Sequence, residues 1–265
     1  MSRTLRRSRL ATPELDLRHV VTLFGAVLLL YFLVPVAVLF VTYSPTALAS
    51  AVTAGYVVEA AATSLAGASV STAVAFVFGL PLAYWLSRAS GPAPTAALGV
   101  VVFPLVLPPV VSGMLLLTVV GPDGLAAVAG LELTRSLGGV VAAQTFVAAP
   151  FFVVTAKAAF DSVDTELEEA ARTLGRDWPA TMRDVTVPLA KPGIVAGLVL
   201  TFARAMGEFG ATMMLAYYPR TLPVQIWTSF ISEGLDAALP VAVVLLSVAV
   251  GTLLVVHALW TLPWR

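Results

Sequence analysis

Long apolar segments separated by short polar ones dominate the pattern of this chain. Crossing about 30 Å of hydrocarbon takes roughly 20 residues of α-helix at 1.5 Å per residue. The segments are apolar on all faces and do not alternate in polarity, which favours helices over the strands of a membrane barrel. The pattern predicts six membrane-spanning helices, near residues 20–43, 60–87, 95–120, 137–156, 193–217 and 237–262.

Several small residues and prolines lie inside these predicted spans. A proline removes a backbone hydrogen bond and kinks a helix, and in lipid the freed carbonyls need partners from neighbouring helices or water. The prolines expected to do so are Pro35, Pro81, Pro104, Pro108, Pro109 and Pro150. Gly67 with Ser71, and Ala75 with Gly79, are small residues at four-residue spacing, which suits a close subunit interface.

The composition agrees with an all-α integral membrane protein. Of the 265 residues 59% are hydrophobic and 11% charged, whereas about a quarter of residues are charged in soluble domains. The formal net charge of +0 argues against nucleic acid as a partner. The absence of cysteine excludes disulfides and thiol chemistry, and two distant histidines suggest no metal site. We interpret residues 1–265 as one membrane domain.

The distribution of Lys and Arg predicts the orientation in the membrane, because basic loops are retained in the cytoplasm. With the N-terminus inside, twelve basic residues lie on the cytoplasmic side, against Arg135 and Arg220 outside. The inner twelve are the five arginines of the tail 1–19, Arg88, Arg265 and five residues of the segment 157–191. Both termini are therefore predicted to be cytoplasmic, in a multi-pass protein of the cell membrane.

The segment 157–191 is the only long charged stretch, with seven acidic and five basic residues. It must lie in water, either as a solvated loop that packs onto its own bundle or as the natural surface for a soluble partner. Thr165 with Glu168 fits a capping box, and Gly175 is placed to end the helix. A second short helix is expected with Pro179 in its first turn. An apolar stripe on the first helix is formed by Leu167, Ala170, Ala171 and Leu174, opposite Glu168 and Arg172.

Two ionisable residues, Arg204 and Glu208, fall inside the fifth predicted span. Each costs about 2.5 to 3.5 kcal/mol near a helix centre on insertion scales, so such groups face a partner or a watery cavity. Their four-residue spacing lets them pair on one helix face. Two interpretations are open: a structural ion pair that locks helices together, or a lining of the translocation path or its gate, with Phe209 and Thr212 as further candidates.

The charged segment resembles a known signature. Glu169-Ala170-Ala171 with Gly175, followed by Val185 and Val187-Pro188, is similar to the EAA motif of ABC importer permeases, with Val in place of the usual Ile and Leu. The resemblance implies a six-helix bundle of the type I ABC importer permease kind. It also implies that a coupling helix docks onto the ATP-binding subunit. The docking residues that the resemblance implies are Glu169, Ala170, Ala171 and Gly175. We expect Glu168, Arg172 and Leu174 of the same helix to belong to the docking surface as well.

A second resemblance concerns the substrate. The stretch from Arg204 to Thr212 is similar to the fifth span of the molybdate, tungstate and sulfate branch of these permeases, and 103–111 and 150–164 agree. The branch implies a homodimer with two ATP-binding subunits and an external oxyanion-binding protein. It also implies import of molybdate or tungstate by alternating access, with ATP and Mg²⁺ held by the partner ATPase and no cofactor on this chain.

Other functions remain open at this stage. The chain has no P-loop and no catalytic set of side chains, so we expect a permease subunit and not an enzyme. Alternatives are a permease for sulfate, phosphate, ferric ion or thiamine, or an ion-coupled secondary transporter that uses Arg204 and Glu208 as a relay. Outside the membrane, Ile226, Trp227, Phe230 and Ile231 have helical spacing. They predict a short interfacial helix, which either anchors the chain at the interface or, with the loop 121–135, offers a platform for a binding protein.

Overall fold

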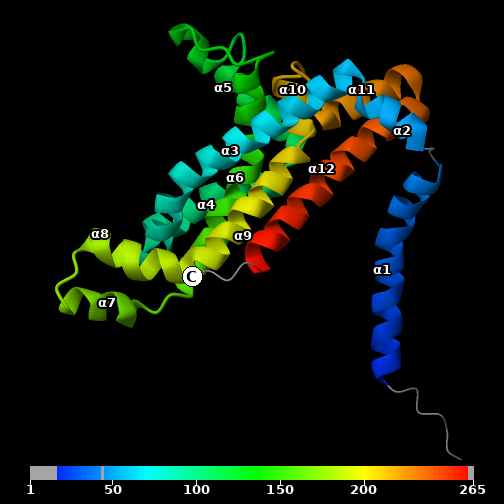
Figure 1. The fold of residues 1–265 in the computed structure, drawn as a ribbon. Coiled ribbons are helices and arrows are strands. Elements are labelled where there is room, and N and C mark those ends of the chain that lie inside the picture. The colour runs from blue at the N-terminus through cyan, green and yellow to red at the C-terminus, as the bar shows by residue number, and fades with distance from the viewer. Residues whose placement is uncertain (1–16, 43–44, 262–265) are drawn as a thin grey trace, which may run out of the picture. The chain divides into compact units, whose positions relative to one another are not determined.

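The computed structural model describes residues 17–42 and 45–261 (Figure 1). The chain divides into two compact units, Met1–Leu48 and Ala49–Arg265, and each is described by itself. Arg3, Arg6, Arg7 and Arg9 of the predicted inner tail lie outside the described residues, as does Arg265. The interpretation of the whole chain as one domain stays a prediction.

The first unit contains helix α1, Leu17–Thr42. Its apolar side chains are exposed around the whole helix, for example Phe24 and Leu28. A helix that is apolar on every side needs lipid or another apolar surface around it. The short helix α2, Pro45–Val52, follows.

The second unit contains all the remaining helices. The long ones are α3 Gly55–Arg88, α6 Leu137–Asp161, α9 Val187–Met206 and α12 Leu235–Thr261. Shorter ones are α4 Pro92–Val106, α5 Pro109–Val120, α7 Thr165–Thr173, α8 Trp178–Thr181, α10 Gly210–Leu215 and α11 Leu222–Glu233. A 3-10 turn covers Leu125–Ala129 and a π turn, η2, covers Met182–Thr186. Within the described residues, six helical segments are long and apolar enough to cross a membrane, so the predicted all-α six-span membrane fold is confirmed.

The core of the second unit lies where α3, α6 and α9 pack against one another. Small residues of α3 make this contact close: a Cβ at Gly79 would lie 2.9 Å from Phe152 Cδ1, and one at Gly67 would lie 2.7 Å from Gln144 Oε1. Ser71 and Ala75 are also buried here. The small residues of α3 therefore face α6 of the same chain, and the subunit interface predicted for them is wrong. Their spacing predicts that another helix packs closely against α3, but it does not identify that helix.

Replacing Gly79 with leucine is expected to lower the free energy of unfolding of the detergent-solubilised protein by about 1 to 3 kcal/mol, the usual cost of overpacking a core. The same change at Gly99, in α4, is the matched control, because no atom lies within 4 Å of a Cβ built there. Unfolding followed by far-UV circular dichroism measures both variants. Equal stability of the two would contradict this packing of α3 on α6.

The third predicted span is not one helix. It is divided into α4 and α5 at Leu107 and Pro108, whose backbones are extended, with ψ of 138° and 134°. Two successive prolines explain the break, because each disfavours the helical conformation of the residue before it and neither donates an N–H. By contrast, Pro35, Pro81, Pro104 and Pro150 lie inside helices that continue through them.

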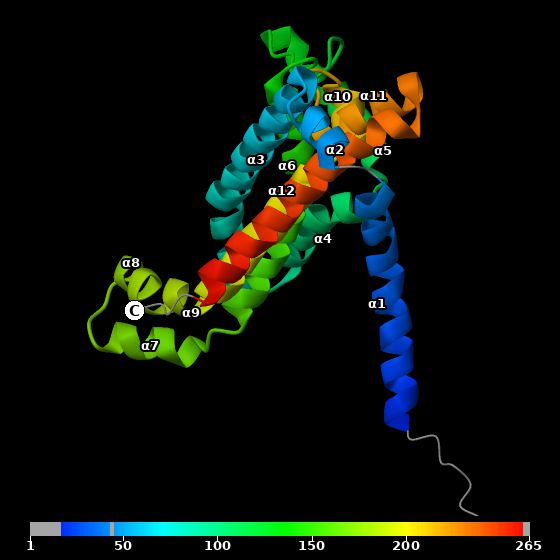
Figure 2. The same cartoon turned by 45° about the vertical axis from the view of Figure 1, so that its right-hand side comes forward.

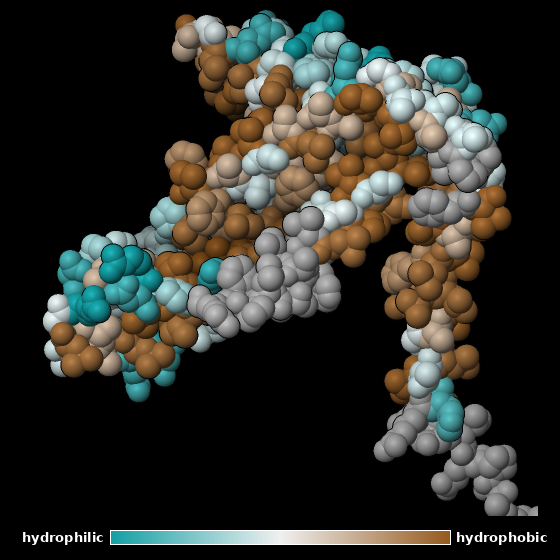
Figure 3. Space-filling model, in the orientation of Figure 1, coloured by the Kyte–Doolittle hydropathy of each residue, from teal (hydrophilic) through white to brown (hydrophobic). Residues whose placement is uncertain are grey.

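The two ends of the second unit are formed by different helices. Helices α7 and α8 lie together at one end, and α10 and α11 lie at the other (Figures 1 and 2). Between them the visible surface is largely hydrophobic, whereas polar residues gather at both ends (Figure 3). An apolar belt between two polar caps is the surface that a bilayer requires.

Candidate functional site

The predicted docking helix exists as α7, but its N-terminus differs from the prediction. The N-cap is Asp164, whose Oδ1 accepts a hydrogen bond from the Glu166 N–H at 2.9 Å. The predicted capping box of Thr165 and Glu168 is therefore wrong. A carboxylate one residue earlier takes the capping position, and the Glu168 side chain bonds elsewhere.

The C-terminus of α7 is formed as predicted. Gly175 has φ of +87°, the left-handed conformation that glycine adopts without steric cost. Its N–H donates to the Arg172 carbonyl at 3.0 Å, and the Arg176 N–H donates to the Ala171 carbonyl at 3.1 Å. These two bonds make a Schellman motif, which satisfies the last carbonyls of the helix and turns the chain away.

One face of α7 is apolar and open to solvent. None of the nine residues of α7 is buried. Leu167 is 49% exposed and Leu174, the residue after the helix, is 85% exposed. Ala170, Glu169 and Arg172 are exposed and Ala171 is half-buried. The structure therefore presents the predicted stripe outward, and Glu168 is the predicted docking residue that points into the protein.

The second short helix, α8, is also present. Asp177 caps it by accepting a hydrogen bond from the Ala180 N–H at 2.9 Å, and Pro179 lies in the first turn. The helix leads into the π turn η2, a feature that is frequent at functional positions in helices. Thr186, the last residue of η2, is buried and faces α7 through its hydroxyl.

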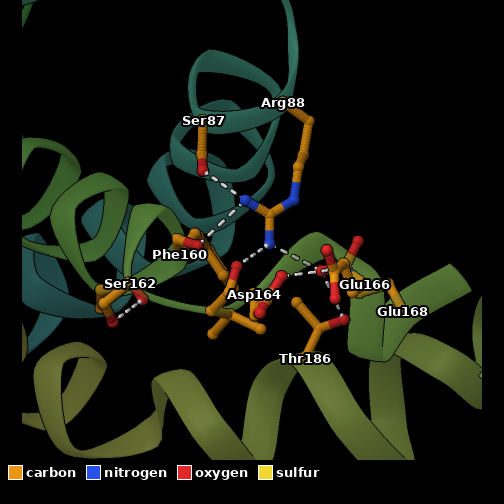
Figure 4. Close-up of polar contacts among 10 residues, drawn as sticks. Ser87, Arg88, Phe160, Ser162, Asp164, Glu166, Glu168 and Thr186 are labelled. Carbon is orange, nitrogen blue, oxygen red and sulfur yellow. Dashed lines mark hydrogen bonds and ion pairs between the residues drawn. The ribbon is translucent and has the colours of Figure 1, made fainter. Parts of the chain in front are cut away.

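Arg88 joins several elements at this end of the bundle (Figure 4). Its Nη2 lies 2.7 Å from Glu168 Oε1 of α7 and 3.3 Å from the Val163 carbonyl, and its Nη1 donates to the Phe160 carbonyl at 3.0 Å. The same Glu168 oxygen accepts a hydrogen bond from the Thr186 hydroxyl at 2.9 Å. We call these contacts the Arg88 bridge. From the sequence, Arg88 indicated only orientation. The only feature of the sequence that could have marked Arg88 is that it is a single basic residue at the end of a predicted span.

The fifth span also departs from the prediction. Helix α9 ends at Met206, and α10 begins at Gly210, so Glu208 lies in a break and not within a continuous helix. The Glu208 carboxylate is 1% exposed and lies 2.6 Å from Arg204 Nη1, and its Oε1 accepts a hydrogen bond from the Ala211 N–H at 2.9 Å. The carboxylate thus satisfies a donor that the break leaves free while it neutralises the arginine.

The four residues predicted to line a path are not equivalent. Arg204 is 27% exposed at its side chain, and Phe209 is half-buried with its ring 5.7 Å from that of Trp227. Glu208 and Thr212 are buried within this chain, and the Thr212 hydroxyl has no hydrogen-bond partner. Of the four, only Arg204 has a partly exposed, positively charged side chain that could contact an anion.

A short helix, α11, is confirmed where the sequence predicts one, and its place on the outer face stays a prediction. Leu222 and Val224 are buried, whereas Trp227, Phe230 and Ile231 are exposed. Its role as a platform stays a prediction. Across the described part of the chain, no group of three or more His, Cys, Asp or Glu side chains could hold a metal ion.

Comparison with known proteins places these features in context. Residues 75–259 match the model of a family described as binding-protein-dependent transport system inner membrane component. The probable molybdenum ABC transporter permease protein of Haloferax volcanii is 61% identical over 248 residues, which cover 94% of this chain and 92% of that protein. The molybdate/tungstate transport system permease protein WtpB of Thermococcus kodakarensis is 35% identical over 235 residues, covering 88% and 92%.

Solved structures agree on the fold. A bacterial ABC transporter involved in import of the acidic polysaccharide alginate has a TM-score of 0.68 at 17% identity, covering 91% of this chain and 92% of that one. The MetNI methionine ABC transporter in an inward-facing conformation has a TM-score of 0.62 at 22% identity, covering 77% and 94%. The predicted fold of an ABC importer permease is therefore confirmed.

Proposed function

This chain belongs to the family of binding-protein-dependent transport system inner membrane components, and we propose that it is the permease subunit of an ABC importer for molybdate or tungstate. The observation that carries this assignment is the 61% identity, over 94% of the chain, to a probable molybdenum ABC transporter permease. A permease for sulfate, phosphate, ferric ion or thiamine is not favoured, because relatives of similar coverage bear molybdate or tungstate names.

The proposed assembly has two copies of this chain, two ATP-binding subunits and an external binding protein that delivers the anion. A two-fold axis is the common way to close such an assembly, and it places the path between the copies. One of the similar structures, the alginate transporter, is a complex with a substrate-bound periplasmic protein. ATP and Mg²⁺ bind to the partner ATPase, and this chain supplies the path.

In this proposal the end with α7 and α8 faces the cytoplasm of a cell membrane and both termini lie inside. The exposed stripe of α7, with Leu167 and Leu174, docks onto the ATPase. Closure of the two ATPase subunits moves α7, and the bundle then opens to the outside. Such coupling requires that α7 make different contacts in the two nucleotide states, because a ligand shifts an equilibrium only by its differential affinity.

Arg204 is the group of this chain best suited to attract the anion. Its guanidinium is partly exposed and held at the break between α9 and α10 by Glu208. A carboxylate beside the arginine leaves little net charge, which allows attraction of a divalent oxyanion without trapping it. Planar guanidinium groups match tetrahedral oxyanions by paired N–H donors.

Complementation tests this function. A Haloferax volcanii strain that lacks the 61% identical permease is supplied with this chain, and uptake of radiolabelled molybdate is measured. We expect molybdate uptake to be restored. Unlabelled tungstate should reduce this uptake by competition, whereas equimolar sulfate should not. A chain carrying Leu174→Glu serves as the control. We expect it to insert into the membrane but not to dock onto the ATPase, and so not to restore uptake. No restored uptake by a chain that reaches the membrane, or uptake that persists after removal of the ATPase, would refute the assignment.

An ion-coupled secondary transporter is the other class that the sequence left open. It would need no ATPase and no exposed docking helix. The apolar, solvent-facing stripe of α7 has no use in such a protein, and family membership argues against it.

A further inference from the structure

Helix α7 has no apolar anchor in the bundle. None of its side chains is buried, and its stripe faces outward. Its most extensive contacts with other elements are to α8 and η2, which belong to the same charged segment. A helix that buries no apolar side chain against the bundle can be displaced by a docked partner without moving the bundle. Whatever transmits force from α7 must therefore be a specific contact.

The Arg88 bridge is the contact that links α7 to the membrane helices. One oxygen of Glu168 receives Nη2 of Arg88, the last residue of α3, and the hydroxyl of Thr186, which directly precedes α9. Both side chains of the ion pair are mostly buried, with 18% and 14% exposed. Charge-assisted bonds shielded from water are stronger and more directional than surface pairs. A displacement of α7 therefore has to move α3 and α9 or break these bonds.

The guanidinium also fixes the end of α6. Its bonds to the Phe160 and Val163 carbonyls satisfy acceptors at the C-terminus of that helix, where a cation is favourable. Aromatic contacts support the same joint. The Arg88 guanidinium lies 5.8 Å from the Tyr84 ring, and Tyr84 packs edge-on against Phe160 and Trp178, the first residue of α8.

We propose that Arg88 is the positioning residue that makes α3, α7 and the start of α9 move as one body, so that motion of the ATPase reaches the bundle. This inference rests on the proposed function. Arg88 touches neither nucleotide nor anion. It acts through Glu168, and loss of the bridge uncouples ATP hydrolysis from transport without unfolding the helices on either side.

The first test measures coupling in the complete complex in proteoliposomes. Arg88→Gln removes the charge and the fork of donors, and we expect the number of ATP hydrolysed per anion imported to rise about tenfold, within the range of typical coupling free energies. Arg88→Lys keeps the charge but cannot bridge three acceptors in the same geometry, so an intermediate ratio is expected. Lys157→Gln is the matched control, because Lys157 pairs at 2.7 Å with Asp161 of the same helix and removing it disconnects nothing.

A double-mutant cycle separates the bridge from general destabilisation. If Arg88 acts through Glu168, then Arg88→Gln combined with Glu168→Gln raises the ratio no further than the worse single change. Combination of Arg88→Gln with Lys157→Gln gives the product of the single effects. The proposal would be overturned if the ratio in the variant with both Arg88→Gln and Glu168→Gln were the product of the two single effects.

The second test follows the motion itself. The chain has no cysteine, so spin labels attach only at cysteines introduced at Ser90, after α3, and Thr173, at the end of α7. In the complex with its ATPase, we expect the distance between the labels to stay the same with and without ATP. In Arg88→Gln it changes with nucleotide. A distance that changes equally in both proteins would overturn the proposal, as would an unchanged coupling ratio in Arg88→Gln.

Two controls keep these outcomes distinct. Should Arg88→Gln fail to accumulate, Glu168→Gln takes its place; glutamine keeps the size and one acceptor oxygen, so changes in the same direction but of smaller size are expected. The label distance depends on nucleotide and needs no transported anion. Failure of the wild-type complex to import molybdate would thus refute the proposed function while the distance measurement still decides the role of Arg88.

Discussion

Replacing Gly175 with aspartate is expected to reduce anion uptake by at least about tenfold while ATP hydrolysis by the assembled complex continues. Gly175 ends α7 beside the exposed stripe, and no atom lies within 4 Å of a Cβ built there. A side chain therefore meets no steric clash in the free protein, although the positive φ adds backbone strain, and the new carboxylate meets the docked partner. The measurement is uptake and ATPase activity in the same proteoliposomes.

Gly175→Asn separates charge from backbone strain in this experiment. Asparagine has the same shape as aspartate and also tolerates positive φ, so it bears the backbone strain at φ of +87° without the negative charge. We expect Asn to retain most uptake. Glu169→Lys should behave like Gly175→Asp, whereas Glu166→Lys, on the first turn of α7, tests whether any charge change on the helix suffices. Equal uptake by Gly175→Asp and wild type would contradict docking at this end of α7.

Replacing Glu208 with leucine is expected to destabilise the protein by about 3 kcal/mol, because it leaves Arg204 unpaired in a poorly solvated break and removes the acceptor of the Ala211 N–H. Glu208→Gln loses the charge but keeps an acceptor, so a smaller loss is expected. We expect the thermal unfolding temperature in detergent to fall in the order wild type, Glu208→Gln, Glu208→Leu.

The double variant Arg204→Gln with Glu208→Gln decides between the two roles of this pair. Removal of both charges restores much of the stability that either single change loses, because no unpaired charge remains. If Arg204 also attracts the anion, uptake by the double variant stays low despite recovered stability. Normal uptake by a stable double variant would show that the pair only locks α9 to α10.

The sequence alone determined the membrane class, the number of spans and the position of α7 in the charged segment. These features depend on local composition and periodicity: about 20 apolar residues predict a span wherever they occur, and Gly175 after an amphipathic stretch predicts a helix end. The pairing of Arg204 with Glu208 was also predictable from their four-residue spacing, although the structure places Glu208 just past the end of α9 and not inside a continuous helix.

Tertiary structure decided the partners that lie far apart in the chain. Arg88 and Glu168 are 80 residues apart, and nothing in either neighbourhood indicates the other. The same reason explains the wrong predictions. Gly67 and Gly79 indicated close packing, but they did not identify α6 as the neighbouring helix. The Thr165–Glu168 capping box does not form because the Glu168 side chain pairs with Arg88, which is distant in the chain. Local rules set each helix, whereas a contact between helices depends on where the whole chain places the competing group.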